Sequence, residues 1–131
     1  MKVTVDTNVL VRAAVGDDPD QARRASDLLT QAELVAVALP SLCEFVWVLL
    51  RVYRFEAADA ASSIRALLAC ANVHVNRPAV EAGLALLESG GDFADGAIAY
   101  EGRWLGADAF VSFDKQAVAL LSAQGHAARL L

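Results

Sequence analysis

The chain has 131 residues, of which 56% are hydrophobic and 21% are charged, with a mean hydropathy of +0.42 and a net charge of −5. This composition excludes a disordered chain, and the acidic balance argues against the broad electrostatic binding of nucleic acid that strongly basic domains show. No apolar run reaches the length of a membrane span, and Asp6 interrupts the start before a signal-peptide core could form. We therefore expect one compact domain, residues 1–131, in the cytoplasm.

Short runs of β-branched and apolar residues alternate along the chain with longer amphipathic segments. The short runs predict strands at residues 3–5, 34–39, 73–75 and 109–113. The longer segments predict helices at residues 18–32, 41–54, 56–70, 78–89, 93–105 and 114–124. Strands that alternate with helices indicate a parallel sheet covered on both faces. The expected fold class is therefore α/β, a three-layer α/β/α sandwich with a short central parallel sheet.

Cysteine and aromatic residues indicate packing rather than chemistry. Cys43 and Cys70 lie in apolar helical patterns without the spacing of a metal site, so we expect reduced thiols in the core. Trp47, Tyr53 and Trp104 are expected in the core or in a dimer interface rather than as stacking platforms for bases.

Several carboxylates stand at the ends of predicted strands or at the starts of the helices that follow. Asp6 follows the first strand in VTVDTNVL, and Asp114 follows the last in VSFDK. Glu44 is the one charge in LCEFVWVLL, near the start of the helix after the second strand. Asp92 and Asp95, in GGDFADGAIA, begin a further helix and share one of its faces. Because ligands of open α/β sheets bind at the carboxyl ends of the strands, we expect these acids at one edge of one sheet.

Each acid also has a purely structural explanation. Asp6, Asp92 and Asp114 could be N-caps, Asp95 could interact with a helix dipole, and Glu44 could pair with a buried arginine such as Arg12. However, carboxylates gathered at one edge repel one another unless a cation lies among them. Oxygen ligands of this kind suit Mg²⁺ or Mn²⁺, so the residues alone indicate an acidic metal site in an α/β domain.

Four segments, taken in order, resemble the motifs of the PIN-domain family: VDTNVLVRA, LPSLCEFVWVL, DFADGAIAY and FVSFDK. More narrowly, they are similar to those of its VapC-type toxin ribonucleases. The resemblance implies a PIN-like fold and a Mg²⁺- or Mn²⁺-dependent endoribonuclease. It implies that Asp6, Glu44, Asp95 and Asp114 are catalytic acids and metal ligands, and it leaves open whether the accessory acid Asp92 contacts the metal.

The same resemblance assigns roles to polar residues around the acids. Thr7 and Asn8 match the polar pair after the first acid, and we expect one of them to orient that acid or a bound water. The implied reaction is attack of a metal-activated water on an RNA phosphodiester, which leaves a 5′ phosphate and a 3′ hydroxyl. Arg12, Arg51 and Arg54 are candidates for contact with RNA phosphate, and ion pairing with acids is their alternative role.

The resemblance also implies partners. We expect an RNA substrate, a cognate VapB-like antitoxin with a disordered tail, and a homodimer, with no attachment to a membrane. A phosphatase of the haloacid-dehalogenase type needs a second acid directly after the first strand, and DTNV lacks it. A catalytically silent PIN-like module that binds proteins remains the alternative function.

Overall fold

Three short parallel strands organise the first part of the chain. In this computed structural model, which describes residues 1–131, β1 (Lys2–Thr4) pairs with β2 (Leu34–Ala36), and β2 pairs with β3 (Val73–His74). The strand order is β1-β2-β3, so each strand pairs with its successor in the sequence. Parallel neighbours need crossover connections, and helices supply them on both occasions.

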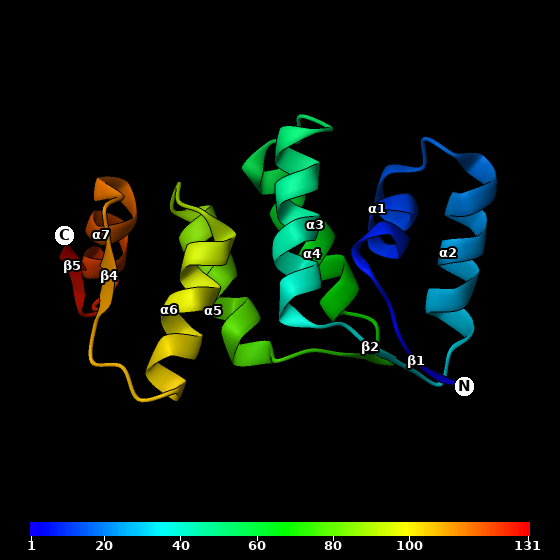
Figure 1. Cartoon of the computed structure of the whole chain (residues 1–131). Coiled ribbons are helices and arrows are strands. Elements are labelled where there is room, and N and C mark those ends of the chain that lie inside the picture. The colour runs from blue at the N-terminus through cyan, green and yellow to red at the C-terminus, as the bar shows by residue number, and fades with distance from the viewer. The chain divides into compact units, whose positions relative to one another are not determined.

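Four helices belong to the same part of the chain. They are α1 (Thr7–Val15), α2 (Pro19–Gln31), α3 (Leu39–Arg51) and α4 (Ala57–Leu68), and α1 contacts both α2 and α3 while α3 contacts α4 (Figure 1). The side chains of Asp6 and Asp18 cap α1 and α2 by accepting backbone N–H groups of the first turn. Gly16 ends α1 at a φ of 72°, a left-handed conformation that glycine adopts without steric cost.

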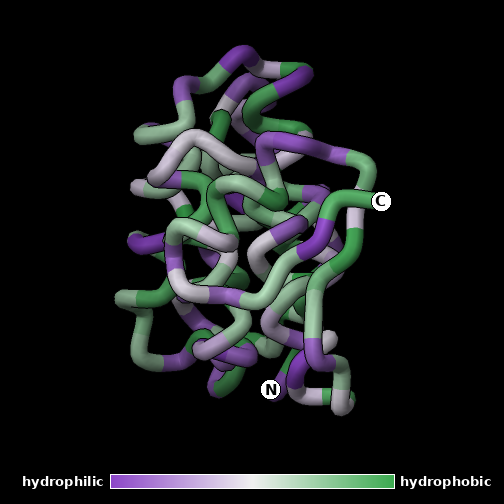
Figure 2. The backbone as a smooth tube through the Cα atoms, turned by 90° about the vertical axis from the view of Figure 1, so that its left-hand side faces the viewer, coloured by the Kyte–Doolittle hydropathy of each residue, from purple (hydrophilic) through white to green (hydrophobic).

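The apolar residues of these elements form a core of β-branched and leucine side chains. Val35 of β2, Leu42 and Leu49 of α3, and Ile64 of α4 are all completely buried. Hydropathy alternates along the backbone between hydrophobic and hydrophilic residues (Figure 2), as expected for helices that bury one face. No helix is long and apolar enough to cross a bilayer.

The remaining elements form a second compact unit. The chain divides into Met1–Asn76 and Arg77–Leu131, and the second unit begins with α5 (Arg77–Glu88) and α6 (Phe93–Trp104), which pack closely together. After them, β4 (Phe110–Ser112) and β5 (Ala128–Leu130) form a parallel pair, and α7 (Lys115–Ala123) connects and contacts both strands. The prediction of a single domain over residues 1–131 stays a prediction.

Glycine allows the close approach of α5 and α6. A Cβ atom added to Gly96 would lie 2.4 Å from the carbonyl oxygen of Ala82, and one added to Gly83 would lie 2.7 Å from the ring of Phe93. Phe93 is completely buried, so its ring occupies the space that Gly83 leaves open. The packing of α5 against α6 therefore depends on small residues at two facing positions.

The predicted fold class is confirmed: the chain is a helix-rich α/β protein with a short parallel sheet of three strands. Several expectations need correction. The strand predicted at 109–113 pairs with β5 in a second, two-stranded sheet, β5 was not predicted, and α1 was implied only by the capping role of Asp6, without a range. Both cysteines are free, as expected, but Cys70 is exposed rather than part of the core.

Candidate functional site

Asp6 stands between the end of β1 and the start of α1. Its carboxylate Oδ1 accepts a hydrogen bond of 3.3 Å from the backbone N–H of Val9, and its side chain is exposed. The predicted capping role of Asp6 is therefore confirmed, while Oδ2 carries no hydrogen bond from the chain. The orienting role expected for Thr7 and Asn8 stays a prediction, because the bond to Asp6 comes from Val9.

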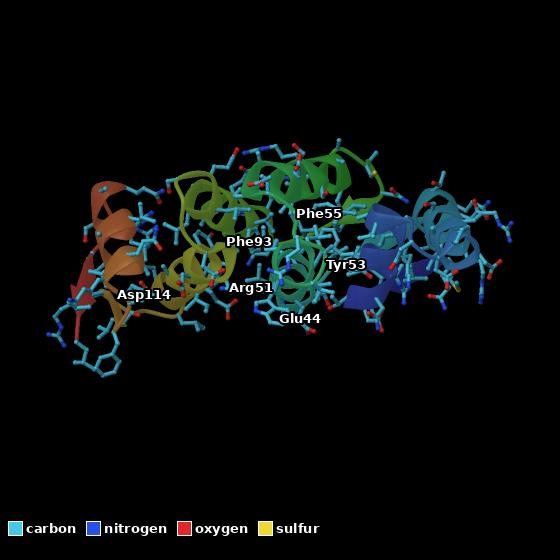
Figure 3. All side chains as sticks on the ribbon, turned by 90° about the horizontal axis from the view of Figure 1, so that it is seen from above. Glu44, Arg51, Tyr53, Phe55, Phe93 and Asp114 are labelled. Carbon is cyan, nitrogen blue, oxygen red and sulfur yellow. The ribbon has the colours of Figure 1, made fainter.

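Glu44 lies on the exposed face of α3. Leu42, Phe45 and Val46 turn inward from the same helix and are buried, whereas Glu44 is exposed. Glu44 and Arg51 both project from α3 (Figure 3), two turns apart, so neither charge is placed in an apolar interior. The suggested pair between Glu44 and a buried arginine is absent, and the carboxylate is available to a ligand.

Three acids of the second unit interact electrostatically. Asp92 caps α6 by accepting from the Ala94 N–H at 3.1 Å, and Asp114 caps α7 by accepting from Gln116 and Ala117 at 2.9 and 3.1 Å. All three capping bonds use Oδ1. Burial raises the pKa of Asp95 above its ordinary value, and the negative charges of Asp92 and Asp114 raise it further.

This electrostatic environment fits a cation. A pKa raised by burial and by neighbouring carboxylates means that negative charge is disfavoured at Asp95 unless positive charge compensates for it. The donor set consists of carboxylate oxygens, which Mg²⁺ and Mn²⁺ prefer, and the capping bonds leave Oδ2 of Asp92 and Asp114 without a partner from the chain. No three histidine, cysteine, aspartate or glutamate side chains already have the arrangement of a metal site.

The acidic residues of the predicted site are divided between the two units. Asp6 and Glu44 belong to Met1–Asn76, while Asp92, Asp95 and Asp114 belong to Arg77–Leu131. The structure brings the last three close enough for their charges to interact. The expectation that one sheet edge carries all of these acids was wrong, because β1 and β4 belong to different sheets.

The three candidate arginines differ in their surroundings. Arg12 Nη1 donates to Oδ1 of Asp17 at 3.1 Å, and the Tyr53 hydroxyl donates to Oδ2 of the same carboxylate at 2.9 Å. Arg51 and Arg54 are exposed, and Arg54 has a φ of 59°, which is uncommon for a residue with a side chain. Arg12 thus has a structural partner, and the other two are accessible to a ligand.

Asp17 was missed by the sequence analysis. The hydrogen bond from Tyr53 lowers the pKa of Asp17, with a further contribution from Arg12, and the same bond raises the pKa of Tyr53. The residue stands in the acidic run DDPD, where only a helix start could be recognised, and its partner Tyr53 is distant in the sequence.

Comparison with known proteins adds one match. A family model described as PIN domain matches residues 3–120, which include all five candidate acids and parts of both units. No curated protein matches the chain.

Proposed function

Because the chain belongs to the PIN-domain family, whose members are generally nucleases, we propose that it is a metal-dependent endoribonuclease and the toxin of a VapBC-type toxin–antitoxin pair. The family match over residues 3–120 is the observation that carries the nuclease assignment. The narrower assignment to RNA and to a toxin is supported by the similarity of the four motifs to VapC-type ribonucleases. We place its activity in the cytoplasm.

The proposed metal ligands are the carboxylates that the motif resemblance assigns. Asp6, Glu44, Asp95 and Asp114 would hold Mg²⁺ or Mn²⁺, and Asp92 would increase the negative potential around them. When bound, the metal would lower the pKa of a water and neutralise charge at the scissile phosphate. Support for these acids comes from the family match, whose range includes all of them, and from the raised pKa of Asp95.

The residues of this chain would act by position and charge. Asp6 is held by the Val9 amide at the first turn of α1, so its free oxygen has a fixed direction. Asp92 and Asp114 are fixed in the same way by the first turns of α6 and α7. Such rigid carboxylates lose little conformational entropy on binding a cation, and no side chain is needed as a nucleophile.

Cleavage of labelled single-stranded RNA by the purified protein tests the proposal. We expect cleavage with Mg²⁺ or Mn²⁺, weaker cleavage with Ca²⁺, and none in excess chelator. Asp6→Asn, Glu44→Gln and Asp95→Asn should each lower the cleavage rate by more than ~10–100-fold, which is the usual cost of losing a group that only hydrogen-bonds to a metal ligand. Asp27→Asn, which removes an exposed acid of α2, is the control and should cleave normally.

The possible results separate the two candidate functions. Full activity in excess chelator would exclude the metal mechanism. A folded protein that cleaves no RNA with any of these metals would favour the silent protein-binding module. RNA ends with a 5′ phosphate and a 3′ hydroxyl would support hydrolysis by activated water.

We also propose a VapB-like antitoxin as partner and a homodimer as the assembly. A largely apolar cavity of about 350 Å³ is lined by residues of α1, α2, α3 and α4 together with Cys70, and it offers space for apolar side chains of an antitoxin tail. Trp47 and Trp104 are 58% and 73% exposed, so the expectation that they lie in the core was wrong, and both are accessible to a dimer interface.

A basic group of the antitoxin tail could enter the acidic site and compete with metal. Titration calorimetry with a purified cognate antitoxin would then show weaker binding to Asp6→Asn and to Asp95→Asn, since each loses an ionic acceptor. Unchanged affinity for both variants would place the inhibitory contact elsewhere. Sedimentation of the toxin alone would decide between monomer and dimer.

A further inference from the structure

A second cavity of about 350 Å³ lies between α1 and α2, inside the first unit. Its lining consists of residues from these two helices: Asn8, Val9, Arg12, Gln21, Arg24, Ala25 and Leu28. The polar side chains among them are two guanidinium groups and two carboxamides, with no carboxylate. In a chain with a net charge of −5, this lining is rich in hydrogen-bond donors.

The cavity begins beside the candidate catalytic acid of the first unit. Val9 lines the cavity, and its backbone N–H donates to the Asp6 carboxylate at 3.3 Å. Asn8 lies in the same helical turn and also lines the cavity. A ligand bound between α1 and α2 would therefore contact the residue whose backbone N–H holds the Asp6 carboxylate.

The two arginines of the cavity retain donors for a ligand. Arg12 uses Nη1 for its bond to Asp17, and a guanidinium has five N–H donors. Arg24 approaches Asp20 at 3.5 Å, while the neighbouring Arg23 holds the same carboxylate at 2.8 Å. Both ion pairs with Asp20 are exposed, and exposed ion pairs of this kind contribute little to the stability of the fold. Arg24 can thus turn to an anion at small cost.

We propose that the cavity between α1 and α2 binds the sugar–phosphate backbone of the RNA next to the cleaved bond, with Arg24 and Gln21 contacting a phosphate. The inference rests on the proposed ribonuclease function. Guanidinium groups bind phosphate oxygens in a bidentate manner, carboxamides donate to the same oxygens, and the cavity has the size of a small-ligand site, ~300–1,000 Å³. Its position beside Asp6 favours the nuclease substrate over an acidic peptide.

Binding of a fluorescent single-stranded RNA of mixed sequence, followed by anisotropy at several salt concentrations, tests this subsite. The full-length protein is used with Ca²⁺ in place of Mg²⁺, so that the RNA remains largely intact. Arg24→Gln should weaken binding about tenfold and reduce the slope of log K against log salt by about 0.7. Gln21→Ala should weaken binding with little change of slope, because it removes no charge.

Arg23→Gln is the matched control. It removes the same charge from the adjacent position of α2 and breaks the shorter pair with Asp20, but Arg23 does not line the cavity. Binding by this variant should stay close to that of the wild type, and its salt slope should not change. Thermal unfolding of all three variants should be similar, because the two arginines and Gln21 are exposed.

The results distinguish the subsite from the proposed function. Equal weakening by Arg23→Gln and Arg24→Gln, or no effect of either, would overturn the subsite even if the wild type binds and cleaves RNA. A polyglutamate peptide that loses affinity for Arg24→Gln while RNA does not would assign the cavity to an acidic peptide and overturn the proposal. A wild type that neither binds nor cleaves RNA would overturn the subsite together with the ribonuclease function.

Discussion

Asp17 is the residue at which two distant segments are joined by hydrogen bonds. Its two carboxylate oxygens accept hydrogen bonds from Arg12 on α1 and from Tyr53, which follows α3 and is labelled in Figure 3. The bond from Tyr53 favours the ionised carboxylate and so lowers its pKa. Because the pKa is lower in the folded state, this stabilisation is present above the ordinary value of 3.8 and is lost as the pH falls.

Tyr53→Phe therefore should raise the pKa of Asp17 towards its ordinary value. The carboxyl resonance of Asp17, followed by NMR during an acid titration, measures this directly. The variant should also unfold at a lower temperature than the wild type at neutral pH, and this difference should shrink at a pH where Asp17 is protonated. An unchanged Asp17 titration would mean that the hydrogen bond is not formed in solution.

The pKa of Asp95 is shifted in the opposite direction, above its ordinary value. Its pKa is raised by burial and by Asp92 and Asp114, so the folded, metal-free protein holds the Asp95 proton more tightly than the unfolded chain does. That contribution to stability is fully present below 3.8 and is lost as the pH rises through the raised pKa. Asp95→Asn cannot acquire the charge and avoids this loss.

We accordingly expect metal-free Asp95→Asn to unfold at a higher temperature than the wild type at neutral pH. The difference should decrease as the pH approaches 3.8 and below, where Asp95 is protonated in both states. Thermal unfolding in chelator at a series of pH values provides the measurement. A variant that is less stable than the wild type at every pH would contradict the raised pKa.

Glu44 shows what the sequence could and could not predict about single residues. The acids could be recognised because they follow predicted strands or begin helices, and three of them are indeed N-caps. The exposure of Glu44 could not be read from LCEFVWVLL, since the run is apolar on almost all sides of the helix. Only the packing of Leu42 and Phe45 fixes which side faces the core.

The contact between α5 and α6 depends on a glycine in each helix. Gly96 brings α6 so close to α5 that an added Cβ would meet the carbonyl oxygen of Ala82 at 2.4 Å and the Cα of Gly83 at 3.0 Å. Backbone atoms cannot turn away as a flexible side chain can. The helices would have to separate, and Asp95, the residue before Gly96, would move with them.

Gly96→Ala should therefore destabilise the protein by about 1–3 kcal/mol, the usual cost of overpacking. Gly102→Ala is the control in the same helix: nothing lies within 4 Å of its added Cβ, and glycine is unfavourable inside a helix. That variant should gain about 0.5–1 kcal/mol. Urea unfolding gives both values, and equal stability of the two variants would show that the helices are not in close contact.

At the scale of elements, periodicity predicted the type of most segments but not how the strands pair. The extent of α1 was not predicted, because TNVLVRAAV has few polar residues to show a helical period. β5 was missed because ARL is too short to carry a pattern. The pairing of β4 with β5 depends on contacts across α7, which no local pattern reveals.

The whole chain joins two compact units, and the candidate acids are distributed over both. The family match spans residues 3–120 and so includes both groups of acids. Neither group contains a ready metal site on its own. Under the proposed function, a metal ion held by these carboxylates stabilises the folded chain, because a ligand that binds only the folded state favours it.

Mn²⁺ should therefore raise the unfolding temperature of the wild type, because a ligand that binds only the folded state stabilises it by about 2.7 kcal/mol at a hundred times its dissociation constant. Glu44→Gln in the first unit and Asp95→Asn in the second should each lose this shift, whereas Asp27→Asn should keep it. Scanning calorimetry with and without Mn²⁺ makes the comparison. Loss of the shift in only one of the two acid variants would remove the other carboxylate from the set of metal ligands.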